Sequence, residues 1–373
     1  MTYANLTAGD PAPFFRQRSG GNPAFNFDTT AGRYIVLCFL GTASDAAGRQ
    51  AFETVMANRG VFDDTHAAFF AVTCDPEDEK QGRLADSYPG IRIFWDLDGS
   101  VSQRYGSLPR TGGDAASFRR QWVIVDPTMR ITRVIPFDVA GGDAASVIAH
   151  VKRLPPPERF AGFEVPPPIL VLPNVFEPEF CKTLVDLYET VGGTESGFMR
   201  EVDGKTVATY DAAHKRRKDV TIEDQALVDA TKQRIVRRVV PEILKVHNFR
   251  VTRMERYIVC CYAAEDGGHF RAHRDNTTKG TAHRRFAVSI NLNDAFTGGE
   301  VNFPEYGPRS FKAPVGGAVV FSCSLLHKVS KVTSGRRYAF LPFLYDDEAA
   351  RLRAANNAFL GEGVGAYQTG KGA

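Results

Sequence analysis

The sequence predicts an α/β unit followed by an α+β unit in which helices precede a β-barrel or jelly roll. In the first half of the 373 residues, continuous apolar runs of strand length alternate with helical segments. In the second half, glycines and prolines separate many short strands. Triple prolines at 155–157 and 166–168 favour a semi-rigid connector, because proline cannot continue a helix or a central strand. We therefore expect domains at 1–154 and 169–373 with a linker at 155–168; an ordered loop within one domain is the alternative.

Four apolar runs in the first half have the length of strands and no polar alternation, which is typical of a sheet covered on both faces. They lie at 34–40, 67–73, 121–125 and 131–135. Helices are expected at 46–58 and at 144–153. This order of elements predicts an α/β sandwich.

The second half begins with a short strand at 169–172 and a helix at 178–188, which a proline opens. A second helix is expected to begin with Thr221 as its N-cap and to end near residue 239. From 254 to 345 the chain consists of short strands and turns, which predicts the double-sheeted β core.

The composition narrows the class of protein. A hydrophobic content of 43% and a net charge of +3 fit a soluble globular protein, and the charge is too balanced to favour nucleic acid. Six cysteines without a CxxC pair indicate free thiols in a reducing compartment. The N-terminus shows no secretory signal, and no apolar run is long enough for a membrane helix. We expect a cytoplasmic protein without nucleic-acid or membrane partners.

Two side chains that suit metal binding, His273 and Asp275, lie two positions apart. On a strand, residues i and i+2 point to the same face, so an imidazole and a carboxylate can reach one ion. A third candidate, His327, follows an apolar strand predicted at 317–321. Two histidines and one carboxylate form a facial triad that leaves open positions on Fe(II). The same donors suit Zn(II), Mn(II) and Co(II), so the spacing leaves the metal open.

Arg337 stands ten residues after His327, where the next strand can bring it into the same barrel. Its planar guanidinium matches a carboxylate through two parallel hydrogen bonds. Because burial of an arginine without an anion is unfavourable, we expect an anionic co-substrate, and 2-oxoglutarate fits. Arg336 points the other way on a strand and is expected to be solvated.

Residues 169–345 resemble the prolyl 4-hydroxylase branch of the 2-oxoglutarate and Fe(II)-dependent oxygenases. The matching positions, in order, are Tyr262, Gly267-Gly268, His273, Asp275, Gly298-Gly299-Glu300, His327 and Arg337. The resemblance implies a double-stranded β-helix in which His273, Asp275 and His327 bind iron.

The resemblance also implies roles in co-substrate binding. Arg337 is expected to bind the distal carboxylate of 2-oxoglutarate, and Tyr262 to contact the co-substrate. Asn291 stands where some relatives place another co-substrate tyrosine, and it is kept as a candidate cofactor-binding residue.

The implied reaction is hydroxylation of an unactivated C–H bond, with release of succinate and CO2. The implied cofactors are Fe(II), 2-oxoglutarate and O2, with ascorbate as an optional addition. A peptidyl or prolyl substrate and a small-molecule substrate both stay open, because a fold does not fix a function. A homodimer is also kept open.

Other polar residues lie close to this motif. The basic run at 214–218 is most simply a solvated loop, with substrate binding as the alternative. For His269 and His283, surface or substrate-loop roles are expected rather than metal ligation.

The first half, over about 5–153, resembles the peroxiredoxins, which implies a thioredoxin-like fold. The segments that carry the match are 6–14, 34–40, 72–76, 96–99 and Tyr105-Gly106. Arg120 stands where that family places an arginine beside its peroxidatic cysteine.

The reactive cysteine of a peroxiredoxin is missing. It belongs at the start of the helix after the first core strand, where the helix N-terminus lowers its pKa. The segment 41–49 contains no cysteine, and Cys38 and Cys74 lie elsewhere. We therefore expect a domain that is not a peroxidase.

Two alternatives to an oxygenase are a thiol peroxidase with a degenerate site and a non-catalytic interaction protein. The missing cysteine counts against the first alternative. The complete set of His273, Asp275, His327 and Arg337 counts against the second.

Overall fold

The computed structural model describes residues 2–110, 117–138 and 142–367. Its internal contacts divide the chain into an N-terminal unit of 1–166 with 304–308, and a C-terminal unit of 167–303 with 309–373. The proline-rich stretch contains a short 3-10 helix, Pro157–Arg159. Within the described ranges, no helix combines the length and the apolar character required to cross a membrane.

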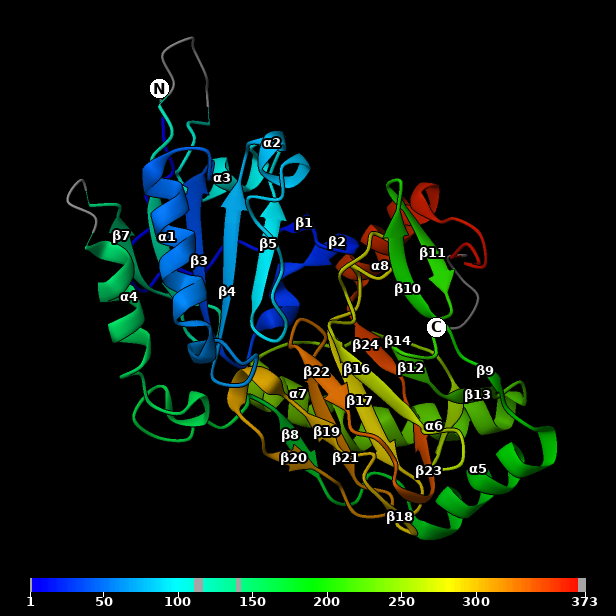
Figure 1. Cartoon of the computed structure of the whole chain (residues 1–373). Coiled ribbons are helices and arrows are strands. Elements are labelled where there is room, and N and C mark those ends of the chain that lie inside the picture. The colour runs from blue at the N-terminus through cyan, green and yellow to red at the C-terminus, as the bar shows by residue number, and fades with distance from the viewer. Residues whose placement is uncertain (1, 111–116, 139–141, 368–373) are drawn as a thin grey trace. The chain divides into compact units, whose positions relative to one another are not determined.

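The N-terminal unit is built on a seven-stranded sheet in the order β2-β1-β5-β4-β3-β6-β7 (Figure 1). Its elements are β1 Arg16–Ser19, β2 Asn22–Asn26, β3 Tyr34–Gly41, α1 Ala46–Ala57, β4 Ala67–Thr73, α2 Pro76–Lys80, β5 Ile91–Trp95, α3 Ser100–Arg104, β6 Gln121–Val125, β7 Ile131–Pro136 and α4 Asp143–Val151. The four predicted strands and two predicted helices are therefore present, with ends within two residues of those expected.

The central strands form a thioredoxin-like core, as predicted. Strands β3 and β4 are parallel and joined through α1, whereas β6 and β7 are antiparallel and lead into α4. The helices α1 and α4 pack on one face of the sheet, where Val36, Val55 and Val147 share one buried cluster. The other face is covered by aromatic rings such as Phe39 against Tyr105. Burial on both faces explains why these strands lack polar alternation.

The place of the peroxidatic cysteine is occupied by an ion pair. Asp45 caps α1 by accepting a hydrogen bond from Gly48 N at 3.0 Å, and its carboxylate also pairs with Arg120. Arg120 further donates from Nε to the Leu40 carbonyl at 2.7 Å. The arginine that a peroxiredoxin would place beside its thiolate therefore has a carboxylate partner here.

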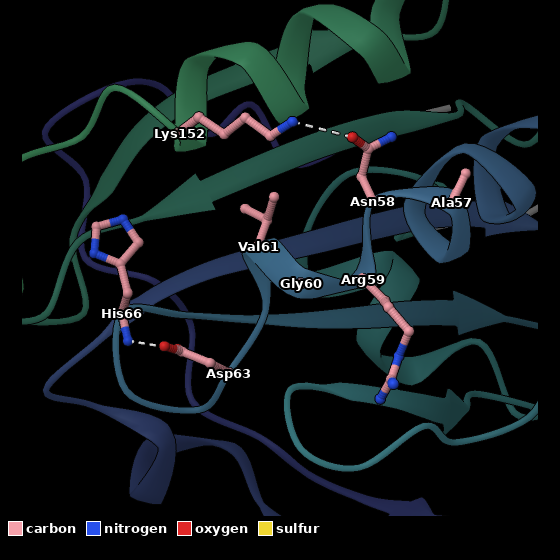
Figure 2. Close-up of a pocket in the computed structure, with 8 residues that line it drawn as sticks. All are labelled: Ala57, Asn58, Arg59, Gly60, Val61, Asp63, His66 and Lys152. Carbon is pink, nitrogen blue, oxygen red and sulfur yellow. Dashed lines mark hydrogen bonds between the residues drawn. The ribbon is translucent and has the colours of Figure 1, made fainter.

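The N-terminal unit also has an open surface hollow beside the end of α1 (Figure 2). Lys152 Nζ donates there to Asn58 Oδ1 at 3.1 Å, and Asp63 Oδ1 accepts from the His66 backbone N at 2.7 Å. None of the site residues predicted from the sequence lies in this hollow. It gives no candidate catalytic site.

The C-terminal unit has two facing sheets and a separate hairpin (Figure 1). Its elements are β8 Leu170–Leu172, α5 Pro178–Val191, β9 Thr194–Glu195, β10 Phe198–Val202, β11 Lys205–Thr209, β12 Lys215–Arg216, β13 Lys218–Thr221, α6 Gln225–Arg238, α7 Val240–His247, β14 Arg253–Glu255, β15 Ile258–Ala263, β16 His269–His273, β17 Phe286–Asn291, β18 Phe296–Thr297, β19 Val301–Asn302, β20 Ser310–Phe311, β21 Ala318–Ser322, β22 His327–Val329, β23 Ser334–Phe340, β24 Phe343–Tyr345 and α8 Asp347–Ala355.

The smaller sheet has the order β12-β16-β22-β19-β20, and the larger sheet is centred on β17, β23 and β15. Tyr262 and Ala339 from the larger sheet share a buried cluster with Phe270 and Val329 from the smaller one. The helices α5, α6 and α7 contribute to a second cluster on the opposite face of the larger sheet. This is the predicted double-stranded β-helix with helices on one side.

One predicted boundary is wrong. Thr221 is the last residue of β13, where it pairs with Ile258, so it does not cap a helix. Asp224 caps α6 instead, by accepting a hydrogen bond from Leu227 N at 2.8 Å. Pro241 lies in the first turn of α7, a position that needs no backbone N–H donor.

The thiols of the N-terminal unit are predicted to be unreactive. Burial raises the pKa of Cys38 well above its usual value and raises the pKa of Cys74 to about 12, so neither forms a thiolate at neutral pH. We expect no reduction of hydrogen peroxide by the full chain with dithiothreitol, measured as peroxide remaining over time. Peroxide loss that disappears in Cys74→Ser would contradict this expectation.

Candidate metal centre and anion site

The three predicted metal ligands lie together at the edge of the smaller sheet. Strands β16 and β22 are antiparallel neighbours, and His273 stands directly opposite His327 in their register. Asp275 follows two residues after β16, where its backbone N donates to the Cys323 carbonyl at 2.9 Å. One ligand atom from each of the three side chains lies within 4.8 Å of the other two. The structure therefore brings together residues more than fifty positions apart.

Both imidazoles turn the same nitrogen toward the carboxylate. His273 Nε2 lies 3.5 Å from Asp275 Oδ1, and His327 Nε2 lies 3.4 Å from Asp275 Oδ2. The Nδ1 atoms contact backbone carbonyls, of Arg271 at 2.7 Å and of Leu325 at 3.0 Å. Because a carbonyl only accepts, Nδ1 carries the proton and the Nε2 lone pair is free for a metal.

The protonation of this group suits metal binding. Burial, and next the neighbouring His273, lower the pKa of His327 to about 4, so its imidazole is neutral at physiological pH. Burial alone would raise the pKa of Asp275, but the two histidines outweigh burial and hold it below its ordinary value. A neutral imidazole and an ionised carboxylate are the forms that coordinate a cation.

Arg337 is buried on the larger sheet, with 2% of its surface exposed. Its Nε donates to Asn291 Oδ1 at 2.9 Å, and its Nη2 donates to Ser289 Oγ at 2.7 Å. The third nitrogen, Nη1, is buried and has no partner. Both partners are neutral, so among the described residues no acidic group within hydrogen-bond distance compensates the guanidinium charge, which is costly for a buried arginine. This arrangement is open to an anion that arrives at Nη1.

Asn291 and Tyr262 lie beside Arg337. The Asn291 amide uses its oxygen for Arg337 and its nitrogen for the Ala313 carbonyl at 2.7 Å, so it holds the guanidinium in place. Tyr262 pairs with Arg337 across β15 and β23, and the guanidinium carbon lies 5.5 Å from its ring centre. Direct contact of either residue with a co-substrate stays a prediction.

Side chains at positions 298 and 299 would clash with neighbouring residues, which explains why both positions are glycine. Gly299 has a φ of +66°, and a Cβ there would lie 2.9 Å from Val332 Cγ2 and 3.1 Å from Arg337 Cδ. A Cβ at Gly298, with a φ of +75°, would lie 2.1 Å from the Lys331 carbonyl. The two glycines let this loop pack against the aliphatic part of Arg337.

The basic run at 214–218 is not a solvated loop, so that expectation is wrong for two of its residues. Lys215 and Arg217 are 5% and 6% exposed, whereas Arg216 and Lys218 are exposed. The run forms β12 and the start of β13, and strand alternation turns every second side chain inward. Lys215 pairs with Phe270 of the smaller sheet, and Lys218 pairs with Cys261 of the larger sheet.

Arg217 connects this run to Tyr262, a candidate co-substrate residue. It binds Asp219 through Nε and Nη2, both at 2.7 Å, and its Nη1 reaches the Tyr262 hydroxyl at 3.4 Å. Its guanidinium carbon lies 5.7 Å from the Tyr262 ring, so Tyr262 has Arg217 and Arg337 as cationic neighbours.

His269 and His283, the two histidines for which the sequence predicts surface or substrate-loop roles, lie in different environments. His269 contacts the carbonyls of Gly267 and Ala213 through its ring nitrogens, and it is not one of the three side chains that lie close enough together to hold a metal. His283 is 1% exposed, so a surface position is wrong for it; its ring packs against Tyr345. Arg336 is half exposed and pairs with Glu265 at 2.6 Å, as expected for a solvated side chain.

Sequence reasoning missed Ser289, Lys215 and Arg217. Ser289 lies two residues before Asn291 on one strand, so the strand period could have placed it on the same face. The buried basic residues gave no such signal, because every residue of the run is basic and no apolar alternation marks an inner face.

Residues 257–345 match the sequence model of the 2OG-Fe(II) oxygenase superfamily. The C-terminal unit contains a 2OG-Fe(II) oxygenase domain. The matched segment includes the three candidate ligands together with Arg337, and it extends from β15 to β24.

The oxygenase domain also resembles a curated relative, the PKHD-type hydroxylase of Bordetella pertussis. The two sequences are 33% identical over 147 residues, which cover 36% of this chain and 63% of the relative. The chain thus spans less than two thirds of the relative's length.

Solved structures resemble each half of the chain. A prolyl hydroxylase from Trichoplax adhaerens, in complex with a hypoxia inducible factor peptide, has a TM-score of 0.38 and 16% identity over 49% of this chain and 86% of its own. The bacterioferritin comigratory protein of Xanthomonas campestris has a TM-score of 0.33 and 18% identity over 39% of this chain and 97% of its own.

We predict that Asn291→Ala and Ser289→Ala each weaken binding of 2-oxoglutarate about tenfold, because each removes a hydrogen bond that orients Arg337. Isothermal titration under anoxic conditions with Fe(II) measures the dissociation constant. Ser334→Ala, an exposed change on β23, the strand of Arg337, is the control and should leave the dissociation constant unchanged. Unchanged affinity in both test variants would contradict the orienting role.

We predict that Asp219→Asn destabilises the oxygenase domain by about 3–5 kcal/mol, because it leaves Arg217 buried without its carboxylate. Urea denaturation measures the loss. Asp266→Asn removes an exposed pair with Lys218 and should cost at most about 1 kcal/mol.

Acid should reproduce the same loss. Burial opposes ionisation of Asp219, but Arg217 outweighs it and lowers the pKa to about 2 in the folded chain, against about 3.9 in an unfolded chain. The stabilisation is therefore complete above about pH 4 and is lost as the pH falls toward 2. An equal acid sensitivity of wild type and Asp219→Asn would contradict this.

Proposed function

We propose that this protein is a 2-oxoglutarate- and Fe(II)-dependent dioxygenase that hydroxylates an unactivated C–H bond. The observation that carries the proposal is the combination of a two-histidine, one-carboxylate group with a buried arginine that lacks a counter-ion. Both features occur within the segment that matches the oxygenase superfamily. On the same grounds we assign catalysis to residues 169–373 and none to residues 1–154.

The residues present fit the metal and the co-substrate. His273, His327 and Asp275 offer two neutral nitrogens and one charged oxygen, a donor set without sulfur that suits Fe(II). The unpartnered Nη1 of Arg337 suits the distal carboxylate of 2-oxoglutarate, while the bond from Nη2 to Ser289 keeps the guanidinium oriented. When bound, Fe(II) and 2-oxoglutarate would supply the oxidation of the C–H bond by O2, with one oxygen atom going to the new hydroxyl, the other to succinate, and CO2 released.

The protein supplies position and exclusion of water. Phe270 stacks on the His273 ring at a centre distance of 3.6 Å, and Phe321 packs on His327 at 4.6 Å, so both imidazoles are fixed by apolar neighbours. Carbonyl contacts to both Nδ1 atoms keep the imidazoles in the tautomer that binds metal. These contacts fix both imidazoles before a metal binds, so that metal binding costs less side-chain conformational entropy.

The substrate is proposed as a peptidyl, prolyl or small-molecule C–H donor. Similarity to the PKHD-type hydroxylase supports a hydroxylase, and it does not choose among these substrates.

The test needs no substrate. Addition of Fe(II) and 2-oxoglutarate to anoxic apoprotein should produce the visible charge-transfer band of a chelated 2-oxo acid. We expect His273→Ala to lose the band and Arg337→Ala to weaken it. His269→Ala is the matched control: its ring nitrogens bond to carbonyls away from the three ligands, so the band should persist.

The absence of a band in folded, metal-loaded wild-type protein would overturn the proposal. A band of equal strength in His273→Ala would show that the metal binds elsewhere.

A further inference from the structure

Lys215 is a buried basic side chain with no acidic partner among the described residues. Only 5% of its surface is exposed, and its Nζ donates to two neutral atoms, Ser196 Oγ at 2.7 Å and the Gly197 carbonyl at 2.6 Å. In the part of the chain that the structure describes, no carboxylate lies within ion-pair distance of this ammonium. Burial of an unpaired charge is strongly unfavourable, so such a lysine calls for an explanation.

The nearest acid cannot serve Lys215, because other groups already use it. Asp219 receives two hydrogen bonds from Arg217, a third from Ser196 Oγ at 2.6 Å, and a contact from Arg256 at 3.4 Å. Burial, and next the positive charge of Arg217, depress the pKa of Lys215 well below its ordinary value, which reflects the missing counter-ion. This part of the domain holds more positive than negative groups.

Lys215 lies close to the candidate metal centre. It stands opposite Phe270 in the β12–β16 pairing, and its Nζ lies 5.0 Å from the centre of the Phe270 ring. The same ring stacks on His273, with ring centres 3.6 Å apart. Lys215 Nζ and the candidate ligand His273 therefore both contact the Phe270 ring, and a small molecule is long enough to reach from one to the other.

The charges of 2-oxoglutarate do not account for this lysine. One carboxylate of the co-substrate belongs with the metal, and the unpartnered nitrogen of Arg337 matches the other. Lys215 lies on the smaller sheet beside Phe270, whereas Arg337 lies on the larger sheet, where Ser289 and Asn291 are its hydrogen-bond partners. Lys215 could therefore receive an anionic group from a molecule other than 2-oxoglutarate.

We propose that Lys215 binds a carboxylate of the primary substrate, and so selects an acid as the molecule that is hydroxylated. This inference rests on the proposed oxygenase function. A bound carboxylate would favour the protonated amine, which has three N–H groups; two already donate to Ser196 and Gly197 and one remains, which suits a carboxylate better than a phosphate dianion. The carboxylate could belong to a small acid or to the free end of a peptide.

The test uses trifluoroacetate as the probe and fluorine NMR as the readout. Full-length, metal-free protein is held in excess 2-oxoglutarate, so that Arg337 is occupied, and the line width of trifluoroacetate is followed as protein is added. We expect saturable broadening with wild type and at least about tenfold weaker binding with Lys215→Met. Trifluoroacetamide, which has the same shape and no charge, should not broaden.

Two variants control for folding and for general charge. Lys215→Arg keeps the charge and should recover part of the binding. Lys218→Met removes an exposed lysine of the same run and should leave binding unchanged. Circular dichroism establishes that all variants are folded.

Addition of Mn(II) then locates the probe. The metal should shorten fluorine relaxation of bound trifluoroacetate in wild type, and this effect should be lost in Lys215→Met. Anion binding is measured first without metal. If the proposed oxygenase function is wrong, trifluoroacetate should still bind, but Mn(II) should not change its relaxation.

Several outcomes would overturn the proposal: no binding to wild type, equal binding to Lys215→Met, equal broadening of trifluoroacetamide, or a lower affinity for 2-oxoglutarate in Lys215→Met. The source of the carboxylate is read by displacement. N-acetylproline alone displacing the probe indicates a small acid, and displacement also by a hexapeptide with a free C-terminus indicates a chain end. Failure of both to displace it would exclude a substrate carboxylate.

Discussion

The antiparallel pairing of β16 with β22 sets His273 opposite His327, and the turn that follows β16 returns Asp275 to the same edge. Successive side chains of a strand face opposite ways, so a shift of one residue in this pairing would turn an imidazole away from the carboxylate. The register is held by apolar contacts on the inner faces, where Phe270 and Val329 pair across the same two strands. The same strand register therefore determines both the packing of the core and the geometry of the candidate metal centre.

A second constraint is the burial of positive charge between the two sheets. Arg337, Arg217 and Lys215 are all nearly inaccessible to water, and Asp219 is the acid that directly pairs with one of them. The folded chain tolerates this because neutral oxygens of Ser289, Asn291 and Ser196 accept hydrogen bonds from these cations. Neutral acceptors satisfy the N–H groups but leave the charge, which favours ligands that bring negative charge with them.

Much of the site could be predicted from the sequence, and the reasons are local. The spacing of His273 and Asp275 follows from the two-residue period of a strand, and Arg337 follows His327 at the distance of one strand and turn. Boundaries were less secure: Thr221 has the composition of a helix cap, yet cross-strand pairing with Ile258 takes precedence and Asp224 becomes the cap. The composition of the basic run predicts a solvated loop, whereas Lys215 and Arg217 are buried. Their burial arises from pairing with strands of two different sheets, which lie far from the run in the sequence.

The segment from β12 to β13 passes from the smaller sheet to the larger one within a few residues. Its strict alternation means that deletion of one residue just before the run would bring Arg216 and Lys218 to the inner positions and turn Lys215 and Arg217 outward, without changing the net charge of the run. The length of this crossing is therefore under tighter constraint than its charge. The exposed Arg216 and Lys218 should accept exchange between lysine and arginine far more readily than the segment accepts insertions, and an engineer who alters substrate choice should change side chains and keep the number of residues.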